Sequence, residues 1–130
     1  MDIDVQIYFF FFEDKLKEVR ILHGVQNPLF GTSQDIKGGI SNFDNLFSAL
    51  KGKYGEPDRL SKKVPEYFTA VEAIEYGETS FYSQWRTKES EIVLFLGKGK
   101  GMFSSVTLAV VYTSIHYKEL EKKEAAKSKL

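Results

Sequence analysis

The sequence lacks cysteine, and this excludes disulfides, thiolate metal sites and thiol catalysis. It also lacks a surplus of either charge, because 18 basic residues balance 18 acidic ones. Nucleic acids and anionic membranes both attract a basic surplus, so this balance argues against either partner. No stretch approaches the roughly 20 apolar residues that a membrane-spanning helix needs. A chain of 130 residues with 42% hydrophobic content is typical of one soluble globular domain.

The N-terminus also lacks a targeting signal as it is written. Residues 1–6 place no basic segment before the apolar run that follows, unlike a secretory signal peptide. The sequence leaves the location open, and the cytoplasm is the interpretation of the sequence as written. The bacterial envelope is the alternative if a leader was removed.

The strongest local pattern is an amphipathic helix over Ser41–Tyr54. Its apolar residues recur at i, i+3, i+4, i+7 and i+11, an arc of about 100° that faces a core. Ser41 with Asp44 forms a capping-box pattern at the start. Gly55 and Pro57 follow where a left-handed cap and a helix stop belong. The apolar stripe consists of Phe43, Leu46, Phe47, Leu50 and Tyr54.

Strands are predicted on both sides of this helix. Residues 3–22 alternate with period two around a polar turn at Glu13–Lys15, which predicts a β-hairpin. The glycine-rich residues 23–40 predict a long loop. Three further strands are predicted over 80–86, 92–96 and 106–113. The segment 92–96 is apolar throughout, so we expect it near the centre of the sheet.

The segment 56–79 leaves two interpretations open. Its apolar residues at 67, 70, 71 and 74 have helical spacing, with Pro65 near a first-turn position and Gly77 at a plausible cap. Alternate residues in the same segment also fit an extended strand. A short helix is the interpretation we adopt.

Together these elements predict an α+β fold. We expect a five-stranded, mainly antiparallel sheet in the order β-β-α-(α)-β-β-β, with the amphipathic helix packed on one face. Residues 1–117 form a single domain in this prediction. Residues 118–130 form a charged C-terminal helix or a disordered tail, because their charges outnumber the residues they could bury.

The order of these elements resembles a group of small uncharacterised bacterial α+β domains. The likeness rests on a hairpin turn at residues 14–16, the helix end Lys53-Tyr54-Gly55-Glu56-Pro57, and strands with Trp85, Ile92-x-Leu94 and Tyr112. It covers about residues 5–115. Many of these domains are exported or lipid-anchored and are distantly similar to the outer-membrane assembly lipoprotein fold. The resemblance implies an envelope role and assigns no functional residue.

The first strand carries aromatic residues on both faces. Ile7, Phe9 and Phe11 alternate with Tyr8, Phe10 and Phe12. An antiparallel strand with one wet face should instead alternate with polar residues, so we expect a second cover. The cover is either the segment 56–79 or another molecule. We predict that Tyr8, Phe10 and Phe12 contribute to a homodimer or a protein-partner interface.

Candidate chemical sites are few. His23 and His116 have no acidic residue or second histidine at metal-ligand spacing, so no metal, cofactor or catalytic residue is predicted. The first function predicted is therefore a non-enzymatic interaction module, with an enzyme ranked third. The second is a small-molecule-binding domain whose aromatic pocket would be lined by Tyr67, Tyr82 and Trp85.

Overall fold

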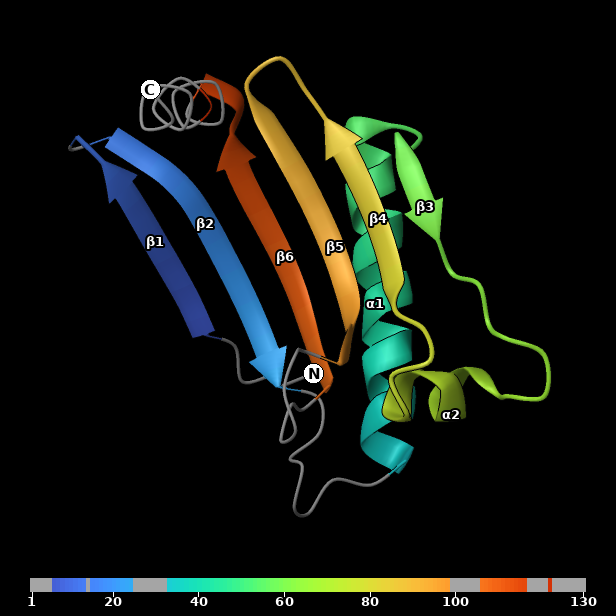
Figure 1. Cartoon of the computed structure of the whole chain (residues 1–130). Helices are drawn as coiled ribbons and strands as arrows, with labels where there is room; N and C mark the ends of the chain where they lie inside the picture. The colour runs from blue at the N-terminus through green and yellow to red at the C-terminus, as the bar shows by residue number, and fades with distance from the viewer. Residues whose placement is uncertain (1–5, 14, 25–32, 99–105, 117–121, 123–130) are drawn as a thin grey trace.

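The computed structural model describes residues 6–13, 15–24, 33–98, 106–116 and 122. Within them it shows six strands in one open antiparallel sheet and two α-helices (Figure 1). The α+β class is confirmed, and the sheet has six strands rather than five. The predicted tail 118–130 lies outside the described residues except for Lys122. The elements are β1 (Gln6–Phe12), β2 (Lys15–Gly24), α1 (Ser33–Tyr54), β3 (Arg59–Ser61), α2 (Ala70–Glu75), β4 (Phe81–Arg86), β5 (Ser90–Lys98) and β6 (Val106–Ser114).

The spatial order of the sheet is β1-β2-β6-β5-β4-β3. The N-terminal hairpin joins the rest of the sheet through β2 and β6, where Ile21 lies opposite Val110. β5 and β6 are therefore the central strands, as the apolar run 92–96 predicted. The register of the hairpin shifts between Phe10 and Phe11, which marks a β-bulge.

Helix α1 begins at Ser33, so Ser41 lies inside the helix and is not its N-cap. The predicted loop 23–40 is wrong for residues 33–40, where two adjacent glycines had suggested a break. Ile36 is fully buried and Ile40 packs on the core, so both extend the stripe of Phe43 toward the N-terminus. This burial outweighs the helix-breaking tendency of glycine, about 1 kcal/mol per residue. The helix ends at Tyr54 as predicted, with Gly55 at a φ of 87°.

The segment 56–79 contains a strand and a shorter helix than predicted. α2 begins at Ala70, after the N-cap residue Thr69, whose hydroxyl accepts a hydrogen bond from the Glu72 N–H in a capping box. Tyr67, at a φ of 74°, precedes the helix and is not part of it. The strand β3 was missed because its three residues are too few to show a period.

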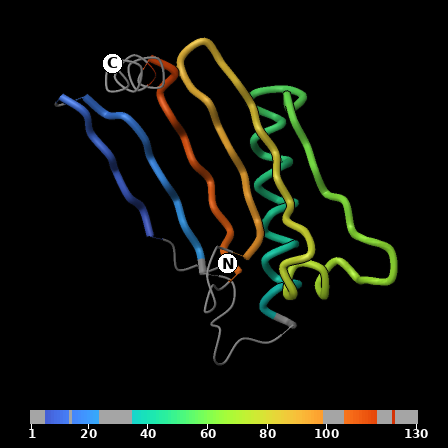
Figure 2. The backbone as a smooth tube through the Cα atoms, viewed as in Figure 1, coloured from blue at the N-terminus to red at the C-terminus, as the bar shows by residue number. Residues whose placement is uncertain are grey.

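The core lies between α1 and the β4–β6 half of the sheet. α1 packs against β5 and β6, and α2 packs against α1 and β5. Figure 2 shows the β1–β2 hairpin extending past both helices. The helices therefore cover only part of one sheet face. The buried cluster is Ile36, Phe43, Leu50, Ile74, Phe81, Trp85, Ile92, Leu94, Leu96, Val106, Leu108 and Val110.

Candidate functional site

β1 is an edge strand with apolar side chains exposed on both faces. On the sheet face against which the helices pack, the exposed fractions are 52% for Ile7, 59% for Phe9 and 65% for Phe11. On the opposite face they are 44% for Tyr8 and 38% for Phe10. Ile7, Phe9 and Phe11, which were not part of the predicted interface, are therefore more exposed than Tyr8 and Phe10. The reason is that α1 lies over the central strands and does not extend to β1.

The segment 56–79 does not cover β1. Its strand β3 forms the opposite edge of the sheet, and its helix α2 packs against α1 and β5. Of the two predicted covers, this one is wrong. Within the described part of the chain, both faces of β1 keep the exposure given above.

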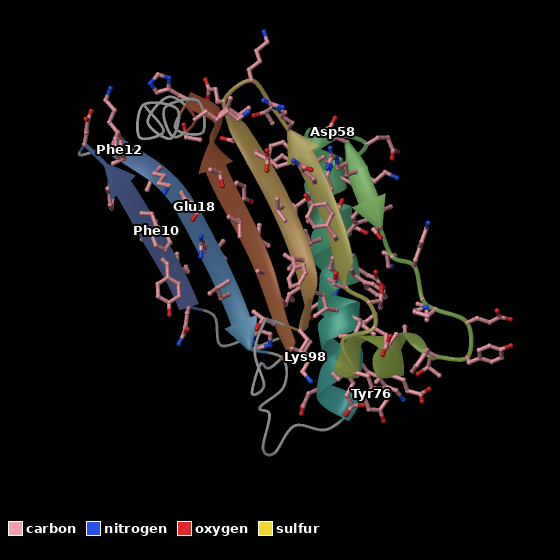
Figure 3. The ribbon with its side chains drawn as sticks, viewed as in Figure 1. Phe10, Phe12, Glu18, Asp58, Tyr76 and Lys98 are labelled. Atoms are coloured by element: carbon pink, nitrogen blue, oxygen red, sulfur yellow. The ribbon has the colours of Figure 1, made fainter. Side chains whose placement is uncertain are left out.

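The residues predicted for an interface, Tyr8, Phe10 and Phe12, lie along this edge strand, and Figure 3 labels two of them. Phe12 is half-buried beside the turn, so it offers less surface than the other two. The Arg20 guanidinium lies 4.9 Å from the centre of the Phe10 ring. This cation–π contact fixes Phe10 against β2.

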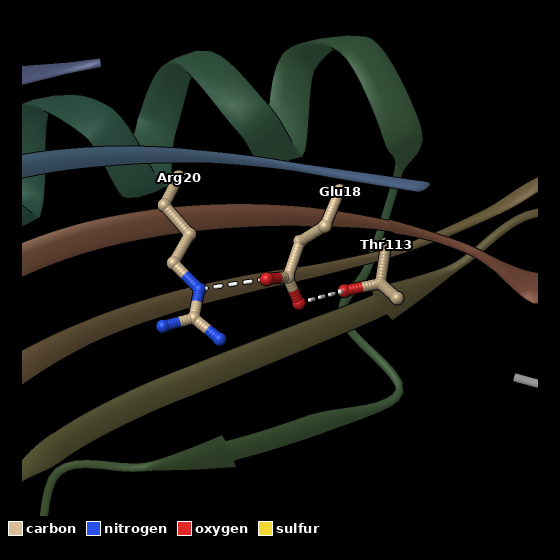
Figure 4. Close-up of polar contacts among 3 residues, drawn as sticks. All are labelled: Glu18, Arg20 and Thr113. Atoms are coloured by element: carbon tan, nitrogen blue, oxygen red, sulfur yellow. Dashed lines mark hydrogen bonds and ion pairs between the residues drawn. The ribbon is translucent and has the colours of Figure 1, made fainter. Parts of the chain in front are cut away.

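Arg20 is itself positioned by a polar chain that reaches β6 (Figure 4). Its Nε donates a 2.7 Å hydrogen bond to Glu18 Oε2, and the Thr113 hydroxyl donates a 3.1 Å bond to Glu18 Oε1. The Glu18 side chain is only 12% exposed, so its carboxylate needs both partners. These contacts connect the hairpin to the central sheet and hold Arg20 beside Phe10.

A second feature is an apolar cleft of about 330 Å³ between α1 and strands β2 and β6. It lies along the edge of α1, where the helix no longer covers the sheet and β2 is the next strand beyond β6. The side chains of Leu46 and Leu50 form one wall, and those of Ile21 and Val110 form part of the floor. The remaining lining residues are His23, Asn42, Asn45, Leu108, Ala109 and Tyr112.

The two ends of the cleft carry polar groups of different kinds. Asn42 and His23 lie at the end near the start of β6. At the other end Tyr112 has a pKa raised from its ordinary value by burial and by Tyr54, while Lys53 opposes that rise. A phenol is protonated at neutral pH even at its ordinary pKa of 10.0, so Tyr112 can donate a hydrogen bond.

The structure does not bring Tyr67, Tyr82 and Trp85 into one pocket. Tyr67 is 93% exposed in the segment before α2, and Trp85 is 1% exposed beneath α1. Tyr82 points to the opposite sheet face from Trp85, because residues an odd number apart alternate along a strand. The Tyr82 hydroxyl donates a 2.9 Å hydrogen bond to the side chain of Gln84.

The sequence did not predict the cleft. It predicted only that two of the residues lining the cleft belong to the core. Leu46 and Leu50 were predicted as core residues, and both also line the cleft. Asn42 and Asn45 flank that stripe, but a helix pattern alone does not say which flank meets a strand. The missing information was that β6 pairs with β2, a contact between residues distant in sequence.

Among the described residues, no group of three or more His, Cys, Asp or Glu side chains has the arrangement of a metal site. Within the same residues, no helix is both long and apolar enough to cross a membrane. The geometry instead offers an apolar edge strand and an apolar cleft, two features suited to binding.

The fold and these two features define a small α+β protein with an open antiparallel sheet that its helices cover in part. No family model, no curated protein and no solved structure matches the chain. The resemblance to exported bacterial domains therefore stays a prediction from the sequence, and so does the envelope location.

Proposed function

We propose that this protein is a non-enzymatic interaction module that associates through β1, and that its partner is a second copy of the chain. The observation that carries the proposal is the exposure of Ile7, Phe9 and Phe11 on an edge strand. Soluble proteins rarely expose a contiguous apolar surface of this kind without a use for it.

The backbone of β1 supports pairing with another strand. Among the strands that the structure describes, β2 is its only neighbour, so one row of N–H and C=O groups faces away from them. Edge strands that must stay single usually carry proline or charged residues. The strand Gln6–Phe12, QIYFFFF, has neither. Addition of a strand at this edge would satisfy the outward row with main-chain hydrogen bonds.

Self-pairing fits the sequence of this strand better than pairing with a charged partner. An antiparallel arrangement centred on Phe9 would place Ile7 opposite Phe11 of the second copy, and it would keep both on the same sheet face. It would bring no charged side chain of β1 against another. The net charge of zero also adds little repulsion between copies.

The available area predicts a modest affinity. A large aromatic side chain buries about 150–250 Å² when it is fully covered. With the exposed fractions given above, the five large apolar side chains of β1 together expose roughly 500 Å² per copy. A standard interface buries about 800 Å² per partner. We therefore expect a dimer that dissociates on dilution in about the micromolar range.

The test compares two lysine substitutions at matched exposure on opposite edges of the sheet. Ile7 on β1 is 52% exposed and Leu60 on β3 is 51% exposed. Light scattering over a concentration series should show wild type and Leu60→Lys as dimers at high concentration. Ile7→Lys should stay monomeric, with an unchanged circular dichroism spectrum. A wild type that remains monomeric throughout, or an Ile7→Lys variant that dimerises like wild type, would overturn the proposal.

A further inference from the structure

We propose that the cleft between α1 and strands β2 and β6 binds a medium-chain carboxylic acid, with the alkyl chain in the cleft and the carboxylate beside Lys53 and Tyr112. This inference goes beyond association through β1 and does not depend on it. It rests on the lining, the length and the charge of the cleft.

The lining selects an alkyl chain. Leu46 and Leu50 from α1 face Ile21 and Val110 from the sheet across a volume of about 330 Å³. That volume lies at the lower end of the range for ligand sites, about 300–1,000 Å³, and these sites are mostly apolar with a few polar groups. A flexible chain fits an elongated space between a helix and a sheet, and it needs no hydrogen-bond partner along its length.

The length of the cleft suits a chain of medium length. Along α1, from Asn42 to Leu50, the helical rise gives about 12 Å. Along β6, from Leu108 to Tyr112, the strand rise gives about 13 Å. The two estimates agree because the helix and the strand run along the same space. An extended alkyl chain of about this length would reach from the Asn42 end to the Tyr112 end.

The charge of the cleft places the head group at the Tyr112 end. Lys53 follows Leu46 by seven residues and Leu50 by three, so it lies on the cleft side of α1. Its Nζ lies 5.3 Å from the centre of the Tyr54 ring. At the opposite end, the side chain of Asn42 is a neutral amide. Lys53 therefore offers a carboxylate a countercharge beside Tyr112, whereas Asn42 and His23 line the opposite end.

Two other lysines that lie on or beside α1 already have carboxylate partners. Lys51 Nζ lies 3.1 Å from Glu56, and Lys62 Nζ lies 2.8 Å from Asp44. Lys53, by contrast, forms no ion pair with another described residue. Tyr112 can add a neutral hydroxyl donor, since a phenol keeps its proton at neutral pH. A cation and a phenol together favour a carboxylate over an amine or an alcohol.

The test measures binding of decanoate, decylamine and decanol by calorimetry at neutral pH, below the concentrations at which these chains self-associate. Decanoate should bind wild type at least about fivefold more tightly than decylamine, because one charge-assisted contact replaces a repulsive one. Lys53→Gln should weaken decanoate binding about five- to tenfold and leave decanol unchanged. Lys51→Gln is the matched control, since it removes the same charge on another side of the helix, and it should leave all three affinities unchanged.

Two further variants test the position of the alkyl chain. Leu46→Trp should fill the cleft and abolish binding of all three chains. Ile7→Lys should bind decanoate like wild type even if it no longer dimerises, and this result would separate the cleft from the β1 surface. The proposal is wrong if decanoate binds no more tightly than decylamine, or if Lys53→Gln leaves decanoate binding unchanged. Decanoate binding retained by a folded Leu46→Trp variant would also overturn it.

Discussion

The indole N–H of Trp85 donates a 2.9 Å hydrogen bond to the backbone carbonyl oxygen of Gly55, which lies 30 residues earlier. Gly55 ends α1 in a left-handed conformation, with a φ of 87°. Trp85 also packs against Phe47 of α1, with ring centroids 5.7 Å apart. One buried side chain of β4 therefore contacts α1 at two places, through a hydrogen bond just after its last residue and through an apolar contact at Phe47.

Replacing this indole should destabilise the fold even when an aromatic ring is kept. Trp85→Phe removes the donor to Gly55 and leaves unfilled space in the core, so we expect a loss of about 1–3 kcal/mol in the free energy of unfolding. Urea denaturation followed by circular dichroism measures this, because the variant contains no tryptophan to report by fluorescence. Tyr76→Phe, at a position that is 62% exposed, is the control and should stay near wild type. Equal midpoints for Trp85→Phe and wild type would contradict this role of the indole.

Glycines inside α1 and the glycine that follows it should have opposite effects on stability when they are replaced by alanine. A Cβ at Gly38 or Gly52 would meet no atom within 4 Å, and both residues lie inside the helix. Gly38→Ala and Gly52→Ala should each stabilise the protein by about 0.5–1 kcal/mol. Gly55→Ala should instead destabilise it by about 1–2 kcal/mol, because its φ of 87° strains any side chain. Thermal or urea denaturation distinguishes the three. A Gly38→Ala variant with no change in stability would place residue 38 in a loop.

Tyr112 should make stability depend on pH above the neutral range. Its pKa is raised above the ordinary value of 10.0 by burial first and by Tyr54 second. Above that value the unfolded chain loses the phenolic proton while the folded protein keeps it, so the unfolded state binds fewer protons and stability falls as pH rises. The contribution is fully present below pH 10.0. Urea midpoints on both sides of this pH should therefore fall less steeply for Tyr112→Phe than for wild type. Parallel curves would show that Tyr112 does not carry the effect.

Much of the fold could be predicted from local patterns in the sequence. The hairpin turn, the end of α1 at Gly55 and the central position of residues 92–96 all depend on neighbouring residues or on hydrophobic period. The start of α1 could not be predicted this way. The glycine pair at 38–39 signals a break locally, and only the burial of Ile36 in the folded core overrides that signal.

The candidate sites were harder to predict, for the same physical reason. The aromatic strand was recognised as unusual, but its degree of exposure depends on where α1 crosses the sheet. Because α1 lies over β5 and β6, Phe9 loses the cover that its alternation predicted. The cleft beside Leu46 likewise exists only because β2 pairs with β6 beyond the edge of the helix. Neither relation is encoded by residues that are close in sequence.

The last prediction contrasts two phenylalanines that the sequence alone would treat alike. Phe43 of α1 is fully buried against the sheet, with its ring centroid 5.7 Å from that of Phe81, whereas Phe9 is 59% exposed on β1. Phe43→Ala should lower the free energy of unfolding by about 3–5 kcal/mol, since it leaves a cavity in a packed core. Phe9→Ala should change it by less than about 0.5 kcal/mol when the protein is dilute enough to be monomeric. At high concentration Phe9→Ala should in addition weaken self-association. If both substitutions destabilise the dilute protein equally, β1 belongs to the core of the monomer, and the surface on which we base the association is not available.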